Sequence, residues 1–479
     1  GEEQQMRITF PLYQLASYSE DQAAWILEPG KYGIWVGNEL NTSVLSGALE
    51  LDQEAVMVQC ENICPLKEEL NEIMPFARKV QAWHEELKAK GIAPVAVKAA
   101  DIPTEKVAYQ QIPDVLPGKA GEIVEQMSED QLVQMATGDP GKDQSNALGS
   151  AGISVPGSAA ETPLVAAKEP WNVASIALAD GPAGLRLKKE YQVDDGRIVP
   201  TDFLAALEGG FFAEEQVKRG ASYYQYCTAI PVGTLLAQTW NLEMVQELGE
   251  MIGHEMELFG VTLWLAPGMN IHRNPLCGRN FEYYSEDPLL AGMMAASMTL
   301  GVQKVPGCGT TIKHYACNNQ EDNRMGSDSV LSERTLREIY LKGFEIAVKD
   351  AQPMSIMTSY NLINGVHAAN CYDTCTKAAR DEWGFAGAIM TDWTTTNVQI
   401  QGECTAAGCM RAGNDMVMPG MEEDHENIRK ELKEGTLDIR ELKRCIYNTV
   451  NIILQSNQYE DAVSYEKQFD GLGEWMTVK

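Results

Sequence analysis

The sequence predicts an α/β fold, most simply a (β/α)8 TIM-like barrel that follows a smaller β-rich part. Residues 1–60 contain short β-branched and aromatic runs. From about residue 170, short apolar runs alternate with stretches of helical periodicity. Six strand–helix units over roughly 300 residues are typical of a parallel sheet, most simply a closed one. With 479 residues, the chain is long enough for two or three domains.

We expect four parts along the chain. Residues 1–62 are β-structure, and 63–117 are a connector with helical periodicity at 66–90 followed by a proline-rich extended stretch. Residues 118–460 form the barrel and 461–479 a C-terminal tail. Because a few strands without a partner sheet make a poor core, the first part is expected to be a portion of a sandwich.

The individual elements follow from periodicity and from turn residues. In the first part, strands are expected at 7–12, 23–28, 31–38 and 55–60. In the barrel, strands are expected at 175–179, 261–266, 310–312, 354–358, 388–390 and 416–418. Helices are expected at 128–136 with Ser128 as N-cap, and at 241–259, 289–302, 332–348, 373–383, 425–433 and 437–455. The Gly/Ser/Pro-rich stretch 139–157 is expected to be a loop.

Composition limits the classes of function. The chain has 68 Asp+Glu against 38 Lys+Arg, a formal charge of −30, which disfavours nucleic acid and anionic membrane as partners. No run of 18 or more apolar residues suggests a membrane span. The start lacks both the features of a signal peptide and a first Met, as in a processed or truncated chain. The eleven cysteines show no pairing or zinc-ligand pattern, so free thiols in a reducing, cytoplasmic compartment are expected, with no metal or cofactor.

Polar side chains follow the ends of the predicted barrel strands. They are Asp180, then Arg279 with His272 and Arg273, then Lys313 and His314 with Arg324, then Tyr360, then Asp392 beside Trp393. Because the carboxyl ends of barrel strands meet at one face, this pattern predicts a shared polar pocket. An acid beside an indole suits sugar chemistry, since the ring stacks on a sugar and the carboxylate meets the anomeric carbon. Cations such as Lys313 and Arg279 are expected to lower the pKa of Asp392, and Tyr360 to donate to it.

Each of these residues also has a structural interpretation. Asp392 is a possible helix N-cap and Asp180 a turn residue. Lys313 and His314 fit a salt bridge and a core histidine, and Arg279 fits an ion pair with Glu282 or Glu286 that holds a loop. Tyr360 fits simple packing with its hydroxyl bonded. We interpret His272 and Arg273 as structural.

Six motifs in order resemble glycoside hydrolase family 3, and within it the β-glucosidase branch. They are L-A-D-G-P-A-G-L-R (178–186), A-P-G-M-N-I-H-R-N-P-L-C-G-R-N-F-E-Y-Y-S-E-D-P (266–288), K-H-Y-A-C-N-N-Q-E (313–321), M-T-S-Y-N-L-I-N-G (357–365), M-T-D-W (390–393) and N-D-M-V-M-P-G (414–420). Residues 7–62 resemble the second half of the family's fibronectin-III-like domain, here placed before the barrel as in members with inverted domain order.

The resemblance implies a retaining exo-hydrolase of β-D-glucosides. Asp392 matches the nucleophile that forms a glycosyl-enzyme. The residues that match the holders of the sugar hydroxyls are Asp180, Arg279, Lys313, His314 and Arg324. Tyr360 matches the tyrosine beside the nucleophile, and Trp393 matches the indole of the subsite wall.

One departure concerns the general acid/base. In the family's three-domain members it is a glutamate on a separate α/β sandwich domain, and nothing in residues 1–117 resembles such a domain. Glu282 and Glu286 fit loop-holding roles. We therefore expect a companion polypeptide or an upstream part of the protein to supply the acid/base.

Other functions remain open from the sequence. A β-xylosidase or another exo-glycosidase of the same family needs the same motifs, and a sugar-binding barrel without turnover needs only the pocket. The N-acetylglucosaminidase branch fits less well, because a catalytic histidine loop is replaced here by Y-A-C-N-N-Q-E. A barrel lyase with Lys313 as Schiff base would use the same lysine.

Overall fold

The computed structural model describes most of the chain as two compact units. The described residues are 5–39, 41–71, 78–139, 154–167, 171–195, 197–199, 220–397, 404–459 and 476–478. Unit 1 comprises residues 1–108, 331–338 and 474–479, and unit 2 comprises 109–330 and 339–473. Each unit is described by itself.

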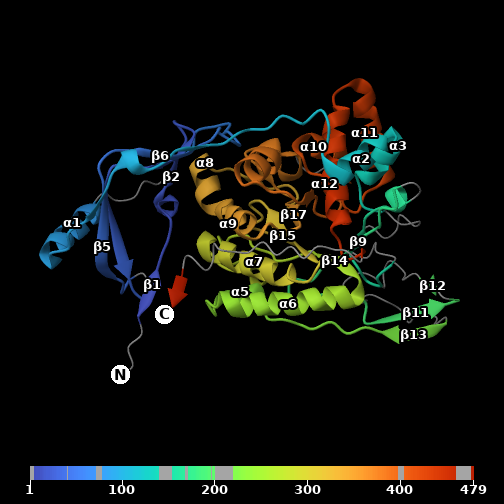
Figure 1. The fold of residues 1–479 in the computed structure, drawn as a ribbon, viewed down its shortest axis with the longest axis horizontal. Coiled ribbons are helices and arrows are strands. Elements are labelled where there is room, and N and C mark those ends of the chain that lie inside the picture. Colours follow the sequence, from blue (N-terminus) through green and yellow to red (C-terminus); the bar gives the residue numbers. More distant parts are fainter. Residues whose placement is uncertain are drawn as a thin grey trace. The chain divides into compact units, whose positions relative to one another are not determined.

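Unit 1 is built on two small sheets (Figure 1). One has the order β2 (Ser17–Ser19), β3 (Ala24–Leu27), β6 (Ala55–Gln59) and β8 (Glu105–Lys106). The other has the order β4 (Gly30–Val36), β5 (Val44–Leu51) and β7 (Val95–Val97), and β1 (Met6–Ile8) pairs with β21 (Met476–Val478). Helix α1 (Arg78–Lys90) and the short helices η1 (Leu12–Leu15), η2 (Ala99–Asp101) and α8 (Glu333–Thr335) complete the unit.

Three features of unit 1 differ from the expectation. Strands β2 and β5 were not expected. The predicted helix over 66–90 begins at Arg78 among the described residues, since 66–71 are not helical and 72–77 lie outside them. Strands β7 and β8 come from the stretch expected as a connector, and they pair in parallel with β5 and β6. The unit therefore extends to residue 108, past the expected end at 62.

Unit 2 is organised around a curled six-stranded sheet with the order β20-β17-β15-β14-β10-β9. The strands are β9 (Ala160–Glu161), β10 (Ala177–Ala179), β14 (Val261–Trp264), β15 (Gly309–Tyr315), β17 (Ser355–Thr358) and β20 (Ala388–Met390). All residues of these strands are buried, as their continuous apolar runs predicted. Five of the six predicted strand positions coincide with β10, β14, β15, β17 and β20, and all of these pair in parallel.

The two edges of this sheet are joined through short bridging segments. Met390 bridges in parallel to Met416, in the sixth predicted strand, and Val417 bridges to Thr137. The amide of Asp139 then donates to the carbonyl of Glu161 in β9 at 2.8 Å. Because β9 runs antiparallel to β10 and the bridging segments are not full strands, the regular (β/α)8 barrel remains a prediction.

Helices surround the sheet of unit 2. They are α2 (Gly118–Gln126), α3 (Glu129–Met135), α5 (Gly233–Ala237), α6 (Leu242–Phe259), α7 (Pro288–Val302), α9 (Lys342–Ala351), α10 (Ala406–Ala412), α11 (Glu422–Glu434) and α12 (Ile439–Leu454), with a π-helix at Asp373–Glu382. A second π-helix, Leu336–Tyr340, includes residues of both units. Short 3-10 turns lie at Leu164–Ala167, Asn280–Glu282 (η6), Ala368–Asn370 and Thr395–Asn397. Two small sheets were not expected: β12 (Arg197–Ile198), β11 (Glu190–Asp194) and β13 (Ala221–Tyr224), and β16 (Asp328–Ser329), β18 (Leu362–Ile363) and β19 (Val366–His367).

Local signals explain where the long helices begin and how they pack. The Asn241 side chain caps α6, and Gly260 ends it in the left-handed conformation at φ 73°. Ser128 is the N-cap of α3 as predicted, and it also forms a capping box with Gln131. Helices α6 and α7 lie side by side (Figure 1), and a Cβ added at Gly301 of α7 would lie 2.0 Å from the Gln246 carbonyl oxygen.

Some expectations are only partly met or lie outside the described residues. The single helix predicted at 332–348 is divided among α8, a π-turn and α9. Most of the loop expected at 139–157 and of the tail at 461–479 lies outside the described residues. The eleven cysteines, all of which lie in the described part of the chain, form no disulfide, and ten of them are buried. Among the described helices, none has the length and hydropathy needed to span a bilayer.

Candidate active site

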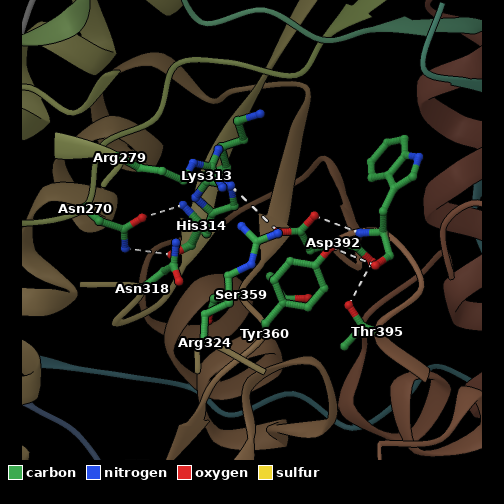
Figure 2. A network of polar contacts seen from close by, with 12 residues as sticks. Asn270, Arg279, Lys313, His314, Asn318, Arg324, Ser359, Tyr360, Asp392 and Thr395 are labelled. Atoms are coloured by element: carbon green, nitrogen blue, oxygen red, sulfur yellow. Dashed lines mark hydrogen bonds and ion pairs between the residues drawn. The ribbon is translucent and has the colours of Figure 1, made fainter. Parts of the chain in front are cut away.

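The carboxyl ends of four strands of one sheet bring the predicted polar residues together. Asp180 directly follows β10, Lys313 and His314 lie near the end of β15, and Tyr360 and Asp392 come two residues after β17 and β20. Figure 2 shows Lys313, His314, Arg324 and Tyr360 gathered about Asp392. The parallel order of these strands places their ends at one edge, as the sequence analysis expected.

Asp392 is a buried carboxylate, with 8% of the residue exposed. Its Oδ1 accepts a hydrogen bond from the Trp393 amide at 2.8 Å, and Nε2 of His314 lies 3.7 Å from its Oδ2. Burial raises the pKa of Asp392 above its ordinary value, although the charges of Arg279, Lys313 and Arg324 lower it. The cations act as predicted, but the expected net lowering is wrong because desolvation is the larger effect.

Each of these three cations has a carboxylate partner of its own. Lys313 Nζ lies 2.9 Å from Oδ1 of Asp180, Arg324 pairs with Glu321 at 2.8 Å, and Arg279 pairs with Glu282. The Arg279–Glu282 pair is one of the two loop-holding pairs that the sequence allowed. It does not remove Arg279 from the site, because the guanidinium still lowers the pKa of Asp392.

Asp180 is held by two cations. Its Oδ2 lies 2.6 Å from Arg186, which is half exposed, and its Oδ1 contacts Lys313. Burial raises the pKa of Asp180, but the charges of Lys313 and Arg186 outweigh burial and lower it well below its ordinary value. Asp180 is therefore ionised at any pH near neutrality, and it serves as the counter-ion of a lysine that is only 3% exposed.

His314 is neutral and rigidly placed. Burial, followed by the charges of Arg279, Lys313 and Arg324, lowers its pKa well below the ordinary value. The Asn270 side chain makes two hydrogen bonds to the His314 main chain. Its Oδ1 accepts from the His314 amide and its Nδ2 donates to the His314 carbonyl, both at 2.8 Å. Asn270 was not among the predicted site residues.

Tyr360 contacts both Arg324 and the backbone beside Asp392. Its hydroxyl donates to the Trp393 carbonyl at 2.7 Å, and the Arg324 guanidinium lies over its ring at 4.6 Å. Burial and then the charge of Asp392 raise the pKa of Tyr360 far above its ordinary value. The Tyr360 hydroxyl was expected to donate to the Asp392 carboxylate, but its hydrogen bond goes to the Trp393 carbonyl. Side-chain hydrogen bonding with Asp392 still contributes to the raised pKa of Tyr360.

Trp393 lies mostly in packed interior. It is 9% exposed and belongs to the main hydrophobic cluster of unit 2. Among the described residues, its Nε1 has no hydrogen-bond partner. A role as subsite wall stays a prediction.

Two further buried residues complete the site. Tyr283, next to η6, and Asn318, after β15, both lie within the long motifs noted in the sequence, but neither is marked there by an apolar run that ends beside it. The Tyr283 hydroxyl lies 3.1 Å from Nδ1 of His314, and Nδ2 of Asn318 donates to that hydroxyl at 2.9 Å.

Half of the chain matches a family model. The model described as "Glycosyl hydrolase family 3 N terminal domain" matches residues 211–450. The chain belongs to glycoside hydrolase family 3. A second model, "Fibronectin type III-like domain", matches residues 1–40.

Known members of family 3 are similar over much of this chain. "Beta-glucosidase A" of Butyrivibrio fibrisolvens is 32% identical over 94% of this chain and 52% of its own length. The structure of β-glucosidase 3B from Thermotoga neapolitana in complex with α-D-glucose has a TM-score of 0.59 and 38% identity, over 74% of this chain and 45% of that one. A β-glucosidase from Paenibacillus barengoltzii has a TM-score of 0.71 and 29% identity, over 93% and 47%. The chain spans about half the length of the relatives it matches.

Proposed function

We propose that this chain carries the nucleophile and the sugar-binding pocket of a retaining, exo-acting β-glucosidase that removes terminal non-reducing β-D-glucosyl residues. The observation that supports it is the placement of one buried carboxylate, Asp392, among three cations and a neutral histidine from neighbouring strand ends. The relatives named β-glucosidases support the substrate class.

In this proposal Asp392 attacks the anomeric carbon and the aglycone leaves with a proton from a general acid. Water then cleaves the aspartyl ester, and the base takes its proton. Asp180, Arg279, Lys313, His314 and Arg324 hold the sugar hydroxyls, Trp393 lines the pocket, and Tyr360 fixes the backbone that carries the nucleophile. The ion pair of Lys313 with Asp180 favours this role for the lysine over a Schiff base, which needs a free amine.

We further propose that the acid/base comes from outside these 479 residues. A retaining enzyme needs a second carboxyl about 5–5.5 Å from the first. Among the described residues, the carboxylates that share the cations of the site are Asp180, Glu282 and Glu321, and each is ion-paired. A companion chain or an upstream α/β domain would supply the acid.

We also propose that the fibronectin-III-like part precedes the barrel in the inverted domain order. The two family models match in that order, and relatives match over both parts of the chain. Eleven cysteines that form no disulfide in the described part of the chain, ten of them buried, fit a reducing compartment such as the cytoplasm.

Covalent trapping tests the nucleophile independently of the acid. The dinitrophenolate aglycone of an activated 2-deoxy-2-fluoroglucoside departs without protonation. This chain alone should therefore accumulate a glycosyl-enzyme. Peptide mass mapping should place the label on Asp392. Asp392→Asn should abolish labelling, whereas the control Glu286→Gln, at an exposed carboxylate, should label like the parent chain. Undiminished labelling of Asp392→Asn would contradict the assignment.

Two more experiments separate the alternatives. The matching fluoroxyloside should label more slowly if the pocket selects a glucosyl unit, and faster if this is a xylosidase. Intact-mass analysis of the active enzyme should show a larger or second polypeptide. Full turnover of an unactivated glucoside by a lone 52.7 kDa chain would refute the external acid/base.

A further inference from the structure

Behind His314 lies a buried hydrogen-bonded chain that the proposed mechanism does not use. Tyr283, His314 and Asn318 are each at most 2% exposed. The Tyr283 hydroxyl lies between Nδ1 of His314, at 3.1 Å, and Nδ2 of Asn318, at 2.9 Å. The tyrosine ring is fixed in place, since a Cβ added at Gly268 would lie 3.0 Å from it. Figure 2 places Asn318 and His314 together beside Asn270.

The donors and acceptors of this chain can be assigned one by one. An amide nitrogen only donates, so Asn318 Nδ2 donates to the tyrosine oxygen. The phenol has a single proton, and with Asn318 on one side that proton is directed to Nδ1 of His314. A nitrogen that accepts a hydrogen bond carries no proton of its own. His314 is neutral, because burial and three nearby cations hold its pKa well below the ordinary value.

We infer that Tyr283 is a positioning residue that holds His314 in the tautomer protonated on Nε2, so that its N–H faces Asp392. Nε2 lies 3.7 Å from Oδ2 of Asp392. In the other tautomer, the lone pair of Nε2 would face the carboxylate, and both Asn318 and Nδ1 would donate to one phenol oxygen. Tyr283 thus keeps the site from changing between two histidine states.

This inference has a consequence for recognition, which rests on the proposed function. At this position the site donates a hydrogen bond to a sugar hydroxyl and does not accept one. Acceptance falls to carboxylates such as Asp392 and Asp180. A neutral histidine with its second nitrogen occupied by Tyr283 is also excluded as the missing general acid.

Nitrogen NMR of histidine side chains tests the tautomer without reference to activity. The chain has six histidines, so ¹⁵N-labelled histidine gives a small set of signals, and His314→Gln identifies the one that matters. At pH 7 the His314 ring should be neutral with its proton on Nε2. Tyr283→Phe should populate the Nδ1–H form. Tyr284→Phe is the matched control, because it removes a buried hydroxyl one residue away, whose pKa is raised by burial alone, and it should leave the His314 signal unchanged.

A second variant protects the test if Tyr283→Phe does not fold. Asn318→Asp replaces the donor by an acceptor, which should draw the tyrosine proton to the new carboxylate and release Nδ1. His314 should then change tautomer although Tyr283 is intact. A parent chain with His314 protonated on Nδ1 or on both nitrogens would overturn the inference. So would a tautomer that survives both variants.

Kinetics of covalent trapping add a functional readout. Loss of one oriented donor should lower the second-order rate of labelling by the activated fluoroglucoside about tenfold in Tyr283→Phe, and less than about twofold in Tyr284→Phe. Equal rates in both variants would argue against a positioning role. If the parent chain is never labelled while the NMR result is as expected, the proposed function fails and the tautomer assignment stands.

Discussion

The two carboxylates of the site should change stability in opposite directions when they are neutralised. Asp392→Asn removes a charge that destabilises the folded chain. The raised pKa of Asp392 shows that the free-energy cost of burying its charge exceeds the stabilisation by the nearby cations. Asp180→Asn removes a charge that holds Lys313, because the pKa of Asp180 is lowered. Both substitutions keep the size of the side chain, so packing is nearly constant.

The magnitudes follow from the contacts. Each unit by which the folded pKa exceeds the unfolded value near 3.9 corresponds to about 1.4 kcal/mol of lost stability at neutral pH, so Asp392→Asn should stabilise unit 2 by an amount on the order of 1 kcal/mol. Asp180→Asn leaves the nearly inaccessible Lys313 without a counter-charge, which costs about 2–4 kcal/mol. Arg186 adds little, because half of its side chain is exposed.

The pH dependence gives each effect a sign of its own. Because the pKa of Asp392 is raised, its ionisation lowers the stability of the folded chain. The gain in stability in Asp392→Asn is therefore present at pH 7, and it fades as the pH falls through the raised pKa toward the ordinary value near 4. Because the pKa of Asp180 is lowered, its ionised form stabilises the folded chain at any pH above the ordinary carboxyl pKa. The loss of stability in Asp180→Asn therefore persists at pH 5, and it disappears only as the pH falls through the folded pKa.

Hydrogen exchange in β15 and β20 is the suitable assay, because it reports the opening of unit 2 alone. The parent chain and both variants are compared at pH 7 and pH 5. Glu286→Gln, at an exposed carboxylate, controls for loss of net charge. If Asp392→Asn destabilises these strands as much as Asp180→Asn does, burial is not the dominant influence on Asp392.

Three further predictions follow from the same contacts. Arg324→Met removes a charge that lowers the pKa of Asp392, so the acidic limb of the labelling rate by the activated fluoroglucoside should move to higher pH, and an unmoved limb would show that Arg324 is too well screened to matter. Asn270→Ala loses both hydrogen bonds to the His314 main chain, so it should lower the free energy of unfolding in urea by about 2–3 kcal/mol and slow labelling. A fully stable and fully reactive variant would show that these two hydrogen bonds do not hold His314 in place. Gly301→Ala places a Cβ 2.0 Å from the Gln246 carbonyl oxygen between α6 and α7, so it should lower the free energy of unfolding by at least about 1–3 kcal/mol. Thermal unfolding measures this against Ala295→Gly on α7, which instead removes a buried methyl group and should lower the free energy of unfolding by about 1 kcal/mol.

The strand ends were predictable because each is marked in the sequence by an apolar run followed by a polar residue. The runs before Asp180, Lys313 and Asp392 are all buried strands of one sheet. Asn270 carries no such mark: it lies in a loop, and its function is to bond the main chain of a residue 44 positions later. Such a partner is determined by tertiary structure alone.

The helix predicted at 332–348 shows a different limit. Its apolar positions Leu336, Phe344 and Ile346 are buried, whereas Ile339 is exposed. Five residues from Leu336 form a π-turn, and periodicity over so short a stretch does not distinguish it from an α-helix. The net pKa of Asp392 shows a third limit. The sequence identifies the nearby cations, whereas the degree of burial that outweighs them requires the folded chain.

The pairing of charges in the site bears directly on how Asp392 would react. Lys313, Arg279 and Arg324 each have a carboxylate of their own, and among the described residues Asp392 has no direct ion pair with a lysine or arginine. It therefore receives attraction from three cations without a direct ion pair, while its Oδ1 accepts a hydrogen bond from the Trp393 amide. Burial raises its pKa, so this carboxylate is more basic than an exposed aspartate. This basicity favours attack on a carbon that becomes positive in the transition state. A direct ion pair would have lowered the pKa further, but it would have to break during the reaction.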